Sequence, residues 1–244
     1  MTVSAESEDW LRWVLTTSIP LCQLDPSGQV VSRATGVLVG FAGRRFLLSV
    51  EHAVRRGTRG WAIELGFNPN AGTEVYYLNA FAYCAEYRSD TATMRELDLC
   101  FAEVPTALQS RYEYRTPLGL FDQRPHHVFE PDLNALPSAQ SQFAFAGRVS
   151  PEKHGPDTFV FDMVVYPGLR YLRSEDEIHI FQLPVQHPGH EAFKGCSGAP
   201  IVDVNKRVVA LVTSGDVASN TIQGISLARI KPSLEFWCAQ TRGA

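Results

Sequence analysis

The chain has few cysteines for its length, and they are scattered. Five cysteines stand at positions 22, 84, 100, 196 and 238 of 244 residues. An odd number without paired spacing fits neither a disulfide framework nor a zinc site. We therefore expect a reducing, cytoplasmic setting.

Long apolar runs and a strong excess of one charge are also missing. The apolar stretch from Gly36 to Val50 is interrupted by Arg44 and Arg45, well short of a membrane span. The first nine residues are acidic, whereas a secretory signal begins with a basic segment. The net charge is only −4, so we expect neither nucleic acid nor a membrane as a partner.

What the chain does contain is typical of a globular β protein. From about residue 20, short β-rich runs are separated by Gly, Pro, Asn and Asp. About a dozen such runs without long helices predict closed or sandwiched antiparallel sheets. Helical patterns occur only at the two ends, where Trp10 and Trp13 share one face and Leu234 and Trp237 share another. The first helix could pack on the core or dock on a partner.

One turn carries a serine in a setting that suits nucleophilic chemistry. In the segment Gly195-Cys196-Ser197-Gly198, glycines flank the serine just before an apolar strand. Glycine permits the tight backbone that aims N–H groups at a developing oxyanion. The same residues would also suit an ordinary turn between strands.

Two further segments provide the partners that a reactive serine needs. His52 follows a strongly apolar run, and Asp98 stands between Leu97 and Leu99, where we expect a buried carboxylate. A serine hydroxyl requires a base such as histidine, and the imidazole requires an acid that fixes its tautomer. Taken singly, His52 also reads as a strand-end histidine and Asp98 as a turn former.

Together the three segments resemble the chymotrypsin-like (trypsin-like) serine peptidase family. That family places a histidine after a strand, an aspartate in a D-L-A-like segment and a serine in G-x-S-G-x-P. The order His52, Asp98, Ser197 and the separations of 46 and 99 residues match this layout. The resemblance extends from about residue 19 to the C-terminal helix.

The resemblance implies an all-β fold, a double six-stranded antiparallel β-barrel of the chymotrypsin type with a short N-terminal helix and a C-terminal helix. It divides the chain into a helical extension (1–16), a first barrel (17–105), an inter-barrel connection (106–140), a second barrel (141–229) and a terminal helix (230–244). The connection is rich in Pro, Gln, His and Asp and has little periodicity.

The resemblance also implies roles for residues around the serine. The N–H groups of Gly195 and Ser197 would form the oxyanion hole. The substrate-binding residues would be a hydroxyl near the aspartate, two residues that pair with substrate backbone and a pocket wall, namely Thr213, Ser214, Gly215 and Gly224. Glu191 would form the floor of the primary pocket and favour Arg or Lys before the scissile bond. Alternatively, Glu191 is a solvated glutamate on a loop.

Two departures from the family pattern bear on activation. Ala53 stands where extracellular members carry a cysteine, and Cys196 stands where an aspartate often pairs with a new N-terminus. We therefore expect no activation by N-terminal clipping, and a site that is preformed or controlled by a partner. Cys196 itself could be considered as the nucleophile, but its side chain should point away from Ser197.

The expected activity is that of a serine endopeptidase that forms an acyl-enzyme. The expected partners are a protein or peptide substrate and a possible regulatory protein. His187 and His190 lack a third ligand of convincing spacing, so we expect no metal and no organic cofactor. Two alternatives stay open: a catalytically silent binding module with this fold, and an esterase or acyltransferase with the same triad.

Overall fold

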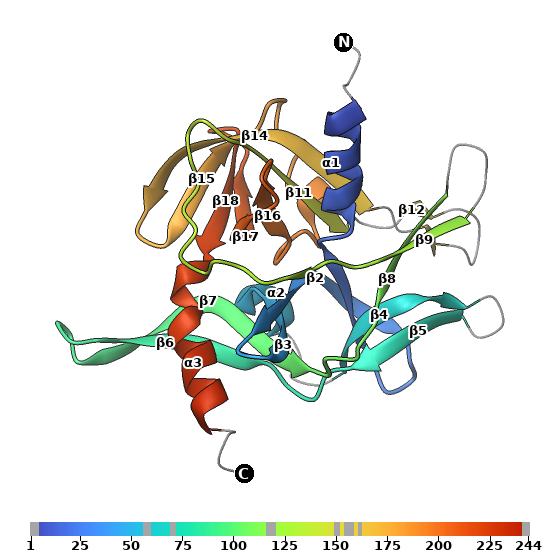
Figure 1. The fold of residues 1–244 in the computed structure, drawn as a ribbon, viewed down its shortest axis with the longest axis horizontal. Coiled ribbons are helices and arrows are strands. Elements are labelled where there is room, and N and C mark those ends of the chain that lie inside the picture. Colours follow the sequence, from blue (N-terminus) through green and yellow to red (C-terminus); the bar gives the residue numbers. More distant parts are fainter. Residues whose placement is uncertain are drawn as a thin grey trace.

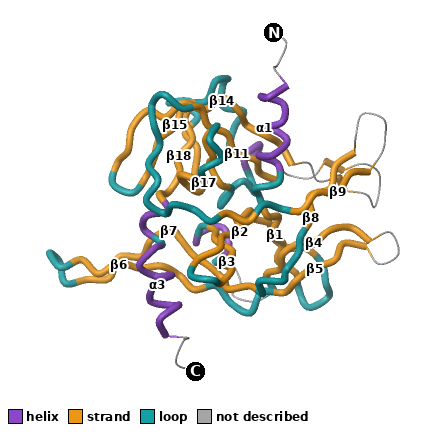
Figure 2. Tube along the Cα trace, in the orientation of Figure 1, coloured by secondary structure: helices purple, strands orange, loops and turns teal. Residues whose placement is uncertain are grey.

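Two β-sheet halves, one above the other in Figure 1, make up the body of the molecule. The computed structural model describes residues 5–55, 60–68, 72–115, 121–148, 152–153, 159–160 and 163–240. Residues 19–104 supply the lower half and residues 142–226 the upper half. Figure 2 shows strands in both halves, with the two terminal helices on the outside. The predicted all-β, chymotrypsin-type architecture is confirmed.

The upper half is the predicted six-stranded antiparallel barrel. Its strands are β11 (Gln142–Arg148), β14 (Met163–Glu175), β15 (Ile178–Gln182), β16 (Pro200–Asp203), β17 (Val208–Asp216) and β18 (Thr221–Ser226). They close in the order β11-β14-β15-β18-β17-β16. Closure leaves no free strand edge, and the side chains of Phe143, Phe145 and Phe181 inside it are fully buried.

The lower half differs from the prediction in its strand count. Its strands are β1 (Ile19–Leu24), β2 (Val30–Phe41), β3 (Arg44–Ser49), β4 (Trp61–Asn68), β5 (Gly72–Tyr77), β6 (Ala82–Arg88) and β7 (Thr93–Val104). They follow the order β5-β4-β1-β2-β3-β7-β6, and in the described part of the chain no ladder joins β5 to β6. β5 and β6 are the two ends of this sheet, and just after β5 the N–H of Leu78 still donates to the carbonyl of Trp61 on β4.

The connection between the halves contains more structure than its sequence indicates. The strands β8 (Arg111–Arg115) and β9 (Phe121–Pro125) form a hairpin, and β10 (Val128–Phe129) pairs with β2 in parallel. Outside the connection, between β11 and β14, the short strands β12 (Glu152–Lys153) and β13 (Phe159–Val160) pair with each other. Because β10 is only two residues long and depends on a distant partner, it has no local periodicity to detect. The domain boundaries drawn from the sequence stay a prediction.

The two terminal helices cover different halves. Helix α1 (Ala5–Leu15) lies against the upper half, where the indole Nε1 of Trp10 donates to the carbonyl of Asp203 at 3.2 Å. Trp13 packs edge-to-face on Phe129, with ring centroids 5.8 Å apart. Helix α3 (Lys231–Gln240) reaches the lower half, and its Trp237 donates to Glu103 at 2.9 Å. Of the two interpretations of the first helix, packing on the core or docking on a partner, the structure shows packing on the core.

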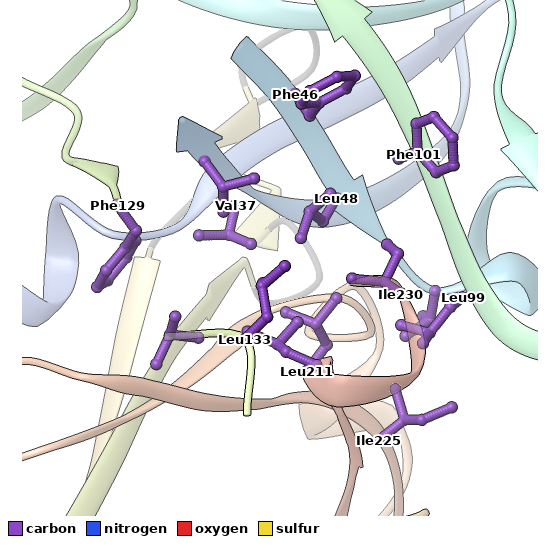
Figure 3. Packing of buried hydrophobic residues seen from close by; sticks show 14 of the residues in the cluster. Val37, Phe46, Leu48, Leu99, Phe101, Phe129, Leu133, Leu211, Ile225 and Ile230 are labelled. Carbon is purple, nitrogen blue, oxygen red and sulfur yellow. The ribbon is translucent and has the colours of Figure 1, made fainter. Parts of the chain in front are cut away.

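A shared hydrophobic core joins the two halves. Figure 3 shows Val37 and Leu48 of the lower half beside Leu211 and Ile225 of the upper half. Each of these side chains is at most 1% exposed. Full burial of one such side chain contributes about 1.5–3 kcal/mol to the free energy of unfolding. This cluster therefore stabilises the packing of one half against the other. In the described part of the chain, no helix has the length and apolar character needed to cross a membrane.

A buried histidine in the connection should make stability fall in acid. Burial lowers the pKa of His126 to about 4 from 6.5 because it disfavours the charged ring. Between these two pH values the unfolded chain binds a proton that the folded chain does not. The contribution of this ring to the free energy of unfolding is therefore fully present above pH 6.5 and is lost as the pH falls toward 4. The loss from this ring should be about 3 kcal/mol.

The measurement is urea unfolding at pH 7.5 and pH 4, compared with the variant His126→Gln. Glutamine does not titrate, so the variant should lose about 3 kcal/mol less than the parent protein over this interval. The variant comparison removes the contribution of carboxylates and of the other histidines. Equal losses in both proteins would contradict the assignment to His126.

Candidate active site

His52 projects from a short helix at the facing edges of the two halves. Strand β3 ends at Ser49, and helix α2 (Glu51–Val54) begins two residues later. The side chain of His52 is 48% exposed, so solvent and substrate can reach the ring. Beneath it, Glu51 is buried and forms an ion pair with Arg55 at 2.7 Å. Burial raises the pKa of Glu51 despite the attraction of Arg55.

Asp98 lies on β7 next to His52. Because alternate side chains of a strand point to opposite faces, the buried Leu97 and Leu99 turn inward and Asp98 turns toward the histidine. Its side chain is 34% exposed, so the expectation of a buried carboxylate was wrong. The carboxylate is nevertheless well held, since its Oδ1 accepts the backbone N–H of His52 at 3.0 Å.

The three sequence-predicted residues meet in one hydrogen-bonded line. Nδ1 of His52 lies 2.8 Å from Oδ2 and 3.0 Å from Oδ1 of Asp98. Nε2 of the same ring lies 3.1 Å from Oγ of Ser197. An ionised carboxylate only accepts, so the Nδ1–H tautomer is favoured. The lone pair on Nε2 then faces the serine hydroxyl, as proton abstraction requires.

The turn before Ser197 has a geometry that requires glycine. Lys194 has φ −63° and ψ 118°, Gly195 has φ +98°, and the N–H of Cys196 donates to the carbonyl of Phe193 at 2.9 Å. These angles define a type II turn with glycine at its third position. In the described part of the chain, the N–H groups of Gly195 and Ser197 donate to no backbone carbonyl.

Cys196 anchors this turn in the upper barrel. Its side chain is fully buried, and a Cβ added at Gly147 on β11 would lie 2.4 Å from its Sγ. Burial raises the pKa of the Cys196 thiol to about 12. A buried, protonated thiol is a poor nucleophile, so the geometry favours Ser197 as the reactive residue.

The lower half holds the serine turn through residues that the sequence analysis missed. Thr35 on β2 donates its N–H to the carbonyl of Ser197 at 3.0 Å and its hydroxyl to the carbonyl of Gly195 at 2.6 Å. The hydroxyl of Ser49 in turn donates to the carbonyl of Thr35 at 2.7 Å. The contacts of Thr35 with the serine turn join residues about 160 positions apart, and no local sequence signal marks them.

A cavity of about 360 Å³ adjoins Ser197, and we call it the specificity pocket. Its lining residues come from η1 (Glu191–Phe193), from the residues on either side of it and from β17 and β18, namely His190, Glu191, Phe193, Lys194, Ser197, Val212, Thr213, Ser214, Gly215 and Ile222. The predicted substrate-binding residues Ser214 and Gly215 therefore border the pocket.

Two of the predicted substrate-binding residues, Glu191 and Gly224, lie elsewhere than expected. Glu191 is 86% exposed and pairs with Lys194 at 3.5 Å, so it lies at the solvent-facing rim and not at the floor. Gly224 is absent from the pocket lining because its Cβ position faces Ile201 and Ala210 inside the barrel. Thr213 lines the pocket, and its hydroxyl donates to the carbonyl of Gln223 at 3.2 Å; its place near Asp98 stays a prediction.

Comparison with solved structures identifies proteins with a similar fold. No protein-family model matches the chain, and no curated protein matches it. A serine endoprotease from Yersinia pestis has a similar structure, with a TM-score of 0.56 at 11% identity over 96% of this chain and 67% of that one. Human heparin binding protein gives a TM-score of 0.56 at 10% identity, over 91% of this chain and 90% of that one. The chain therefore has the fold of the chymotrypsin-like serine proteases.

Proposed function

We propose that this protein is a serine endopeptidase that cleaves peptide bonds through an acyl-enzyme. The observation that carries the proposal is the hydrogen-bonded line from Asp98 through His52 to the Ser197 hydroxyl. A fold alone does not imply an activity, but this arrangement assigns a chemical role to each of the three side chains.

In the proposed mechanism, Oγ of Ser197 attacks the substrate carbonyl carbon while Nε2 of His52 takes its proton. Asp98 holds the ring and stabilises its charged form. The imidazolium then returns the proton to the leaving amine as the C–N bond breaks. Water, deprotonated by the same histidine, hydrolyses the resulting ester and regenerates the hydroxyl.

The N–H groups of Gly195 and Ser197 would stabilise the oxyanion. The type II turn supports this role because it sets the orientation of the peptide between Lys194 and Gly195. A type I turn would rotate that peptide by about 180° and put a carbonyl where the N–H now lies. Backbone donors held in advance cost no reorganisation during the reaction.

We also propose that the site needs no new N-terminus to become active. Cys196 stands where an aspartate often pairs with a new N-terminus, and its buried side chain packs against Gly147 instead. The turn therefore keeps its shape without that ion pair. In the described part of the chain the five cysteines form no disulfide and all are buried, in keeping with a reducing, intracellular setting. Control by a protein partner is part of the same proposal, because a preformed protease in a cell requires restraint.

The test is labelling with a fluorophosphonate, followed by mass spectrometry of the modified peptide and an assay on an unfolded protein substrate. We expect one phosphonylated residue, Ser197, and cleavage of the protein. Absence of both labelling and cleavage would identify a binding module with this fold. Labelling with hydrolysis of esters but not of peptides would identify an esterase.

A further inference from the structure

A histidine that the sequence analysis did not assign lies directly behind the specificity pocket. His187 is only 4% exposed. A Cβ added at Gly215 would lie 2.4 Å from Nε2 of His187 and 3.1 Å from Ile222. The imidazole also packs edge-to-face on Phe193, with centroids 4.7 Å apart. Gly215, Ile222 and Phe193 all line the pocket, so His187 occupies the space into which the pocket would otherwise extend.

Two hydrogen bonds hold His187 in this place. Its backbone N–H donates to Oδ1 of Asn220 at 2.6 Å, which ties its loop to the turn between β17 and β18. Its Nδ1 accepts the N–H of Gly189 at 3.0 Å, so a neutral ring carries its proton on Nε2. Burial lowers the pKa of His187, in keeping with a neutral ring. Movement of the ring out of the pocket wall would break the bond to Gly189.

The lining of the pocket offers no buried charge to a substrate. Phe193, Val212 and Ile222 form its apolar part, and the last two are at most 3% exposed. Glu191 and Lys194 lie at the rim, exposed and paired with each other. Nε2 of His187 is itself inaccessible to solvent, so it presents no donor to the pocket. Uncharged, apolar side chains match such a lining.

We propose that His187 limits the depth of the specificity pocket and restricts P1, the residue on the acyl side of the scissile bond, to alanine or valine. This inference rests on the proposed peptidase function, and it replaces the earlier expectation of Arg or Lys. A hydrophobic pocket discriminates by size to about 10–200-fold per methylene. We therefore expect kcat/KM for P1 valine to exceed that for phenylalanine or arginine by about 100-fold.

The experiment uses fluorogenic peptides and peptidyl phosphonates that differ only at P1, carrying Ala, Val, Leu, Phe, Arg or Gln. The variant His187→Ala should raise reactivity toward Leu and Phe by about 10-fold or more relative to Val. The matched control is His126→Ala. His126 is also buried and is bonded through Nδ1 to Ser110 at 2.9 Å, and its Nε2 has no partner among the residues that the structure describes, but it lines a different cavity. It should leave the P1 ratios unchanged.

A second variant guards against failure of His187→Ala to fold. The methyl group of Gly215→Ala would press on His187, so this variant should lose reactivity toward Val and regain it when combined with His187→Ala. A preference for Arg at P1 would overturn the inference in favour of Glu191 as the specificity residue. A preference for Gln at P1 would overturn it too, because it would show that Nε2 of His187 forms a hydrogen bond with the substrate. Unchanged ratios in the His187 variants would overturn it as well. If no phosphonate or fluorophosphonate modifies Ser197, the proposed function fails together with it.

Discussion

Replacement of Ser197 by alanine is expected to lower kcat by about 10⁴–10⁶-fold while the protein keeps its fold. The hydroxyl is the only group on the line from Asp98 and His52 that can form the acyl-enzyme, and its Oγ lies 3.1 Å from the base. Loss of one oxygen atom leaves the turn intact, since the contacts of Thr35 are with the carbonyls of Ser197 and Gly195. Turnover of a peptide substrate and urea unfolding give the two measurements.

The chain provides a matched control for this variant. Ser110 also forms a hydrogen bond with a histidine, His126, at 2.9 Å. Both residues are buried, and within the described residues no carboxylate bonds the ring of His126 and its Nε2 has no partner. Ser110→Ala should therefore retain the activity of the parent protein. Comparable losses in the two variants, or full activity in Ser197→Ala, would remove Ser197 from the proposed mechanism.

The residues that the sequence could identify are those with a short-range reason for their position. His52 and Asp98 stand out because each interrupts apolar sequence, and Ser197 stands out because glycines flank it. For these three residues the signal is a polar or flexible residue where burial is otherwise expected. The strands of the upper barrel are also evident from the sequence, because they carry clear apolar runs.

The features that sequence reasoning missed depend on contacts between distant segments. Thr35 has no local mark, because its role comes from carbonyls about 160 residues away. The family resemblance predicts Glu191 at the pocket floor from its distance to the serine, but the short helix η1 turns it outward to solvent. His187 occupies the inner position instead. Residue counting cannot distinguish these two outcomes, since the path of a loop depends on what packs beneath it.

The largest effect on stability is expected for Gly198, the residue that follows the serine. It has φ +88°, and an added Cβ would lie 2.0 Å from the carbonyl oxygen of Thr35 and 2.4 Å from Oγ of Ser49. The first of these is a backbone atom of a buried central strand, so it cannot move aside without shifting β2. Gly198→Ala should therefore lower the free energy of unfolding by about 3–5 kcal/mol.

The same shift should reduce activity, because the strand that would move carries the hydrogen bonds from Thr35 to the serine turn.

Gly28→Ala is the matched control. Gly28 has nearly the same backbone angle, φ +81°, but nothing lies within 4 Å of its Cβ position. It should cost only the strain of a left-handed residue, about 1–2 kcal/mol, and leave kcat unchanged. Urea unfolding and peptide turnover on both variants separate backbone strain from steric contact. Equal effects of the two substitutions would mean that the close contact between the halves at Gly198 does not hold the nucleophile in place.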